Sequence, residues 1–208
     1  MKKLLLSLLV IGGINLKAQD ASKVYSATEV VWFGLDFTKA KFVGQFDQGM
    51  GAMPATGGEM RNKWIPQWNA LMQNEQQNFD LRKALNKENV YYDIASVNTL
   101  NGKINPDGCM DFNPTKIEKS EISEMVKKYS SNEKKDGVGL SFIVENFNKG
   151  TQMATVYVTF FDIATKKVLV CGFMEGKVAG VGIRNYWAGA IKSIIKQLGS
   201  GTFKSWKE

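Results

Sequence analysis

The chain has no histidine among its 208 residues, so it lacks the side chain that most often acts as a base near neutral pH. Ser-His-Asp and Cys-His mechanisms are therefore excluded, as are metal sites built on histidine ligands. The two cysteines are too few for a thiolate zinc site or an iron–sulfur cluster. The sequence favours a protein that is not an enzyme, and we expect neither a cofactor nor a metal ion.

Carboxylates are the remaining candidates for catalysis. Asp36, Asp93, Glu145 and Asp162 fall in or beside predicted strands, and two carboxylates that meet in a cleft can hydrolyse a glycosidic bond. In the simpler interpretation, Asp162 closes a hairpin turn and Asp36 pairs with a nearby lysine. A hydrolase acting on envelope polysaccharide is thus an alternative hypothesis, and it requires two of these carboxylates within about 10 Å of each other.

Glycines precede the last predicted helix at Gly180 and Gly182, and Arg184 and Asn185 follow them. Free N–H groups at a helix start attract anions, and an arginine would add positive charge. The pattern comes after an antiparallel strand and lacks the rest of any nucleotide-binding motif. We therefore favour a packing role, in which glycines let helix and sheet approach closely and Asn185 caps the helix.

Two long loops are expected at 44–62 and 101–115. The first is rich in glycine, and Met50 and Met53 would give it adaptable apolar contacts, so it is the favoured binding segment. A segment without fixed structure explains the same composition equally well.

Cys109 and Cys171 form an even pair, which favours a disulfide in an oxidising compartment. The alternative is that Cys171 is a small core residue of a strand and Cys109 a free thiol in a loop. Both interpretations stay open at this point.

The amino terminus predicts export. Lys2 and Lys3 precede a short apolar segment, and Ala18 suits a cleavage site, so 1–18 has the pattern of a secretory signal peptide. Loss of its three lysines lowers the net charge from +7 to +4, which gives no indication of nucleic-acid binding. The mature chain, 19–208, should be periplasmic or extracellular, with no membrane span.

The mature chain should fold as one α+β domain, a mostly antiparallel five-stranded sheet with helices packed on it, in the order β-α-β-α-β-β-β-α. The first strand is expected at 29–37 and the second at 90–100, with a helix from Ile65-Pro66 to about Leu85 between them. Three alternating segments with short links then predict an antiparallel meander, followed by an amphipathic helix. Four of the five tryptophans should lie in the core, whereas Trp206 should be exposed.

Two segments carry a resemblance: VVWFGLDFTKAKFVG, and VTFFDIATKKVLVCGFMEGKVAGVGIRNYWAGAIKSIIK. Their layout resembles that of small exported envelope proteins of unknown function. The element order is similar to that of the amino-terminal domain of the periplasmic protein TolB. The resemblance implies a fold and an envelope setting, and it implies no catalytic residue.

The leading hypothesis is therefore an exported, non-enzymatic binding or assembly module whose partner is another envelope protein. Besides the hydrolase, a carrier of a small ligand or lipid is an alternative. A carrier requires a closed apolar cavity of several hundred Å³.

Overall fold

The computed structural model describes residues 15–48 and 53–207. Its strands are β1 (Glu29–Asp36), β2 (Lys41–Val43), β3 (Asn89–Tyr92), β4 (Met110–Asp111), β5 (Val138–Asn148), β6 (Met153–Asp162) and β7 (Val168–Lys177). The longer helices are α1 (Asn15–Ser26), α3 (Ile65–Asn74), α5 (Ala95–Asn101), α7 (Lys119–Val126) and α8 (Gly182–Gln197). Short helices are α2 (Gly57–Glu59), α4 (Leu81–Ala84), α6 (Pro106–Cys109) and α9 (Phe203–Ser205), with π-helical turns η1 (Met60–Trp64) and η2 (Leu198–Thr202).

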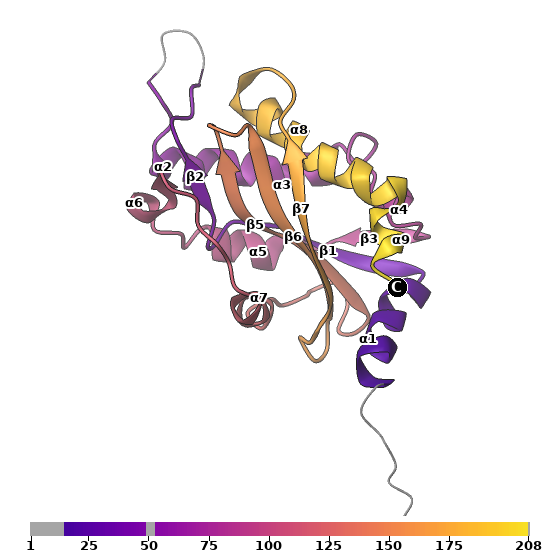
Figure 1. Cartoon of the computed structure of the whole chain (residues 1–208). Coiled ribbons are helices and arrows are strands. Elements are labelled where there is room, and N and C mark those ends of the chain that lie inside the picture. Colours follow the sequence, from indigo (N-terminus) through magenta and orange to yellow (C-terminus); the bar gives the residue numbers. More distant parts are fainter. Residues whose placement is uncertain (1–14, 49–52, 208) are drawn as a thin grey trace, which may run out of the picture.

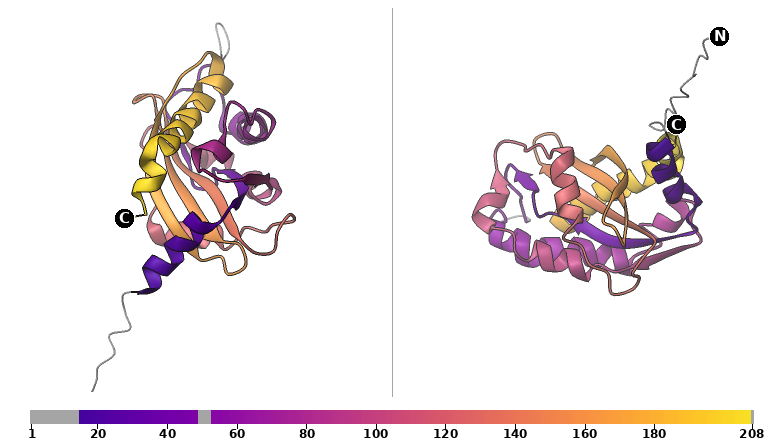
Figure 2. Two further views of the ribbon diagram at one scale, coloured as in Figure 1. Left: turned by 90° about the vertical axis from the view of Figure 1, so that its right-hand side faces the viewer. Right: turned by 90° about the horizontal axis from the view of Figure 1, so that it is seen from below.

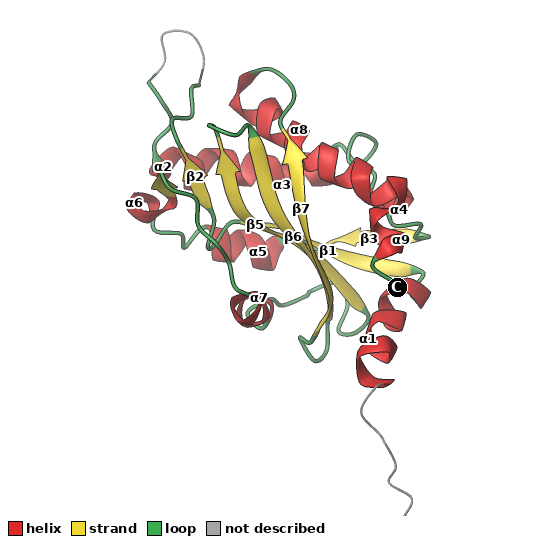
Figure 3. Ribbon diagram, viewed as in Figure 1, coloured by secondary structure: helices red, strands yellow, loops and turns green. Residues whose placement is uncertain are grey.

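The sheet is mixed, so the expected mostly antiparallel five-stranded sheet is wrong. It has seven strands, and five of them run parallel in the order β3-β1-β5-β2-β4. β1 and β2 share one edge of β5, while β6 pairs along the whole other edge and β7 follows it. Figure 1 shows β5, β6 and β7 side by side, and Figure 3 shows the helices around the sheet. β2 and β4 are too short for an alternating pattern, and parallel pairing depends on distant segments.

The meander itself is confirmed. β5 pairs antiparallel with β6, and β6 with β7, through short connections. The final amphipathic helix is confirmed as α8, whose apolar face is buried on the sheet. The helical path does not end with α8, because η2 continues it through Gly199.

β1 supplies both faces of the sheet with core residues. Val30, Trp32 and Leu35 belong to the larger apolar cluster, with α3 and α8. Val31 and Phe33 belong to a smaller cluster on the other face, with α7. The alternation skips one residue at Gly34, where φ is +107° and the register with β5 shifts, as in a β-bulge.

Two buried asparagines replace a missing strand beside the end of β1. The Asn69 amide accepts from Leu35 N at 2.7 Å and donates to Leu35 O at 3.0 Å. The Asn101 amide donates to the same carbonyl at 2.9 Å and accepts from Phe37 N at 2.8 Å. Backbone groups that would otherwise be buried without partners are thereby satisfied.

The predicted helix from Pro66 and the predicted strand at 90–100 both need correction. The helical path starts earlier, at α2, and passes through η1 before Pro66, whose missing N–H disfavours regular α-helical bonding there. α3 ends at Asn74, and α4 forms separately after a turn. β3 stops at Tyr92, and the following residues form α5, because β1 has asparagines beside its second half instead of further strand.

The four tryptophans predicted for the core are buried, as expected. In the larger cluster, Trp187 stacks on Phe147 at a ring separation of 4.6 Å, and Trp68 packs edge-on against the same ring at 5.1 Å. Trp206 is partly buried, contrary to the expectation, because its ring lies over Gly172 of β7, where a side chain would collide with it.

α1 packs on the body of the domain through its last turns. Val24 is fully buried, and the buried Lys87 donates to the carbonyls of Val24 and Ala27, both at 2.6 Å. Tyr25 packs on Phe203, so α1 and the carboxyl-terminal helices lie side by side (Figure 2). The predicted signal peptide falls mostly outside the described residues, and its predicted cleavage site after Ala18 falls within the first turns of α1. Within 15–48 and 53–207, no helix has the length and apolar character needed to cross a membrane.

Candidate binding groove

The candidate site is an open groove on the outer face of α8. Its opposite wall is the turn at 75–80 between α3 and α4, and the segment after β7 closes one end. Glycines place this segment close to the helix. A side chain at Gly176 would lie 2.1 Å from the Ala190 carbonyl oxygen, and one at Gly189 would lie 2.1 Å from the Ala179 carbonyl oxygen.

The groove consists of two adjoining hollows with volumes of about 620 and 480 Å³. Both hollows share Asn78, Lys192 and Lys196, so they lie next to each other along the helix. The floor is mainly apolar and comprises Leu71, Phe79, Val178, Ala188 and Ile195. From Asn185 to Lys196 the groove follows α8 over twelve residues, a rise of about 16 Å.

The rim is positively charged. Lys83, Lys177, Lys192 and Lys196 are exposed, and within the described part of the chain none of them has an ion-pair partner. Lys192 and Lys196 stand one turn apart on the same helix, an arrangement that mildly destabilises an isolated helix.

Two acidic residues lie on the rim, and one of them is neutralised by an ion pair. Glu75 pairs with Arg184 at 3.3 Å, and Asp80 accepts from Lys83 N as the cap of α4. The groove therefore offers an apolar floor between uncompensated cations.

The glycine motif before α8 lies beside this groove, and its residues do not act as the sequence alone suggested. Gly180 and Asn185 line the groove, and Gly182 begins α8 with φ of +75°. Asn185 does not cap the helix, because Val181 occupies the cap position; its amide oxygen instead accepts from Arg184 at 3.0 Å. The close packing at Gly176 supports the packing role that the sequence favoured.

The predicted loop at 44–62 has fixed structure at its carboxyl end. Met50 lies outside the described residues, and Met53 has 81% of its surface exposed. The end of the loop is fixed, because Thr56 and Glu59 form a capping box and a side chain at Gly57 would collide with the Pro106 carbonyl. The second predicted loop, at 101–115, contains α6 and β4.

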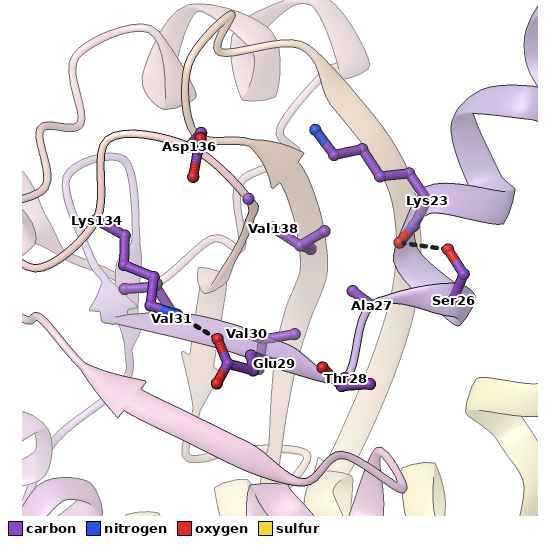
Figure 4. A pocket seen from close by; sticks show the side chains of 11 residues that line it. Lys23, Ser26, Ala27, Thr28, Glu29, Val30, Val31, Lys134, Asp136 and Val138 are labelled. Carbon is purple, nitrogen blue, oxygen red and sulfur yellow. Dashed lines mark hydrogen bonds and ion pairs between the residues drawn. The ribbon is translucent and has the colours of Figure 1, made fainter.

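A second pocket, of about 330 Å³, lies between α1, the start of β1 and the segment before β5 (Figure 4). Glu29 pairs with Lys134 on one wall, and Lys23 of α1 pairs with Asp162. Its main charges are thus neutralised internally. It also faces the amino ends of β1 and β5, whereas ligands of parallel sheets bind at the carboxyl ends.

A third pocket, of about 260 Å³, lies beyond the carboxyl end of β1 and includes Cys109. Lys39 pairs there with Glu121, and Lys41 pairs with Asp111 at 3.4 Å. This pocket is smaller than the groove on α8, and these two lysines are already paired.

Asp36, the most deeply buried carboxylate, has a structural role. It accepts from Thr38 N at 2.8 Å and from the Tyr129 hydroxyl at 2.5 Å. Burial raises the pKa of Asp36, and burial followed by the neighbouring carboxylate raises the pKa of Tyr129. Because both side chains are buried, a substrate cannot reach them.

The other three carboxylates serve separate loops. Asp93 accepts from Ser131 Oγ and from the backbone N–H groups of Asn132 and Glu133. Glu145 accepts from Ile117 N at 2.9 Å. Asp162 binds Thr165 and Lys23; these bonds outweigh the effect of burial and lower its pKa to about 2. Since each carboxylate anchors a different segment, the arrangement does not support the hydrolase hypothesis.

Both cysteines are free thiols in this structure. Cys109 belongs to the larger apolar cluster beside β4, whereas Cys171 packs against the smaller cluster on β7. β4 and β7 lie on opposite sides of β5, so the two Cα atoms exceed the 4.4–6.8 Å typical of a disulfide. An intramolecular bridge therefore does not fit the structure, and burial raises the pKa of both thiols.

In residues 15–48 and 53–207, no three Cys, Asp or Glu side chains gather closely enough to hold a metal ion. A scan against models of known protein families gives no match, and a search of curated proteins finds no similar sequence.

The sequence did not predict the groove. Its walls come from segments about one hundred residues apart, and the lysine face of α8 has the pattern of an ordinary solvated helix face. The absence of acidic residues one turn from Lys192 or Lys196 is the one indication that the sequence contained.

Proposed function

We propose that this is an exported, non-enzymatic binding protein of the cell envelope, and that the groove on α8 is its binding site. The observation that carries the proposal is the contrast between two sets of charged groups. The buried carboxylates are fully engaged in holding loops, whereas the lysines around the apolar groove have no partner within the described chain. The signal-peptide pattern of residues 1–18 supports the proposal that the protein is exported.

Two alternatives have less support. A hydrolase needs two accessible carboxylates in one cleft, and the four candidates are buried and anchor separate segments. A carrier needs a closed cavity, and the groove on α8 is open to solvent along its length.

Site-specific photo-crosslinking in intact cells tests the proposal. The photoreactive residue p-benzoylphenylalanine replaces Ser193, which lines the groove, or Ser120, an exposed control on α7 across the sheet. We expect a discrete adduct from the Ser193 position and none from the Ser120 position. Absence of an adduct at Ser193, or the same adducts at both positions, would contradict the proposal.

A further inference from the structure

We infer that the occupant of the groove is an acidic amphipathic helix of a partner protein; this inference rests on the proposed binding function. The helix would place its apolar side chains on the groove floor and its carboxylates beside the rim lysines. Shape, charge and spacing each support this assignment.

The shape fits a helix that lies along α8. The groove extends about 16 Å along that helix, which corresponds to three turns of a partner. The floor residues Leu71, Phe79 and Ile195 come from three different elements and are held in place by the core.

The charge of the groove selects an acidic partner. Lys83, Lys177, Lys192 and Lys196 are free cations within the described residues, whereas Glu75 is paired with Arg184, and Asp80, which caps α4, leaves the rim with a net positive charge. A basic or neutral segment would leave these lysines uncompensated, and like charges facing each other exclude wrong partners.

The spacing of the lysines favours a helix. Lys192 and Lys196 are separated by one helical turn, about 6 Å along the axis. Glutamates at positions i and i+4 of a partner helix repeat at the same interval, so two ion pairs can form without distortion. Helix-in-groove recognition of this kind uses apolar anchors at i, i+3, i+4 and i+7.

The test uses two designed helical peptides of about 14 residues, or roughly 21 Å. Both carry leucines at helical spacing; one has glutamates and the other lysines on the flanks. Fluorescence anisotropy at about 0.15 M salt measures their affinity for the full mature chain, since long-range attraction is then largely screened. The variant K192E/K196E reverses the rim charge, and K103E/K119E makes the same change of net charge at exposed positions elsewhere.

We expect K192E/K196E to weaken binding of the glutamate peptide at least tenfold, and K103E/K119E to weaken it less than threefold. The lysine peptide should bind K192E/K196E with an affinity within threefold of that of the glutamate peptide for the parent protein. Both variants should keep the melting temperature of the parent, which excludes unfolding as the cause. Equal weakening by both variants, or failure of the charge exchange to restore binding, would overturn the inference.

A lipid headgroup is the competing occupant, and vesicles of phosphatidylglycerol serve as its probe. Binding to vesicles that depends on Lys192 and Lys196, without binding of the glutamate peptide, would overturn the inference. A non-protein adduct at Ser193 in cells would also overturn it, while the proposed binding function would stand. If no adduct forms at the Ser193 position and the glutamate peptide does not bind the parent protein, both the proposed binding function and this inference are contradicted.

Discussion

At the scale of single residues, buried polar side chains hold backbone segments that lack a neighbouring strand. Asn69 and Asn101 bind the end of β1, and Glu145 binds the backbone of Ile117 before α7. Each of these bonds satisfies a group whose burial without a partner would cost about 1–3 kcal/mol. Because Glu145 is engaged in this way, it does not serve as one of the candidate catalytic carboxylates.

Asp36 gives a prediction for the dependence of stability on pH. Burial raises its pKa in the folded state above the ordinary value of 3.8, so the folded protein holds this proton more tightly than the unfolded chain. Its contribution to the free energy of unfolding is therefore present at about pH 4 and falls as the pH rises through the folded pKa.

The variant Asp36→Asn has no proton to lose, so its stability relative to the parent should increase between pH 4 and pH 8. Urea denaturation at both pH values measures this difference. Asp111→Asn is the control, because the Asp111 side chain is about one-third exposed and its pKa is lowered by hydrogen bonds from Asn113 and Phe112. A relative stability of Asp36→Asn that stays constant or decreases over this range would contradict the assignment.

At the scale of elements, a buried lysine helps to hold α1 to the domain, beside the apolar contacts of Val24 and Tyr25. Lys87 donates to two carbonyls at the carboxyl end of α1, where a cation also interacts favourably with the helix dipole. The contact joins the segment nearest the predicted signal peptide to the turn before β3. Burial lowers the pKa of Lys87.

Lys87→Met keeps much of the apolar volume but leaves both carbonyls without their donor. We expect a loss of about 2–3 kcal/mol in the free energy of unfolding, with faster amide exchange in the last turn of α1. Amide exchange in β5 and β6 should become faster only as far as the global free energy of unfolding decreases. The exposed Lys83→Met is the control and should stay within about 0.5 kcal/mol of the parent. Unchanged exchange in α1 would show that Lys87 does not hold this helix.

Elements with a strong local pattern were predictable. The meander and α8 follow from alternation, short polar links and helical spacing within one contiguous segment. The strand predicted at 90–100 was wrong after Tyr92, because strand preference depends on context and β1 offers no further strand pairing beyond this point. β2 and β4 were missed because two or three residues carry no period.

At the scale of the whole molecule, the sheet separates a large core under α3 and α8 from a small core under α7. The groove lies on the outer surface of the helix that covers the large core. It is therefore a surface built on rigid elements, which suits recognition of a partner with little rearrangement. Its position was not predictable, because the 75–80 turn meets α8 only in the folded chain.

The most direct test of the central claim is hydrogen exchange by mass spectrometry, comparing the free protein with the complex isolated from the envelope. Binding in the groove predicts slower exchange in 75–80, in 177–180 and along α8, with no change in α7. Protection confined to α7, or to the pocket between α1 and β1, would contradict the assignment of the groove as the binding site.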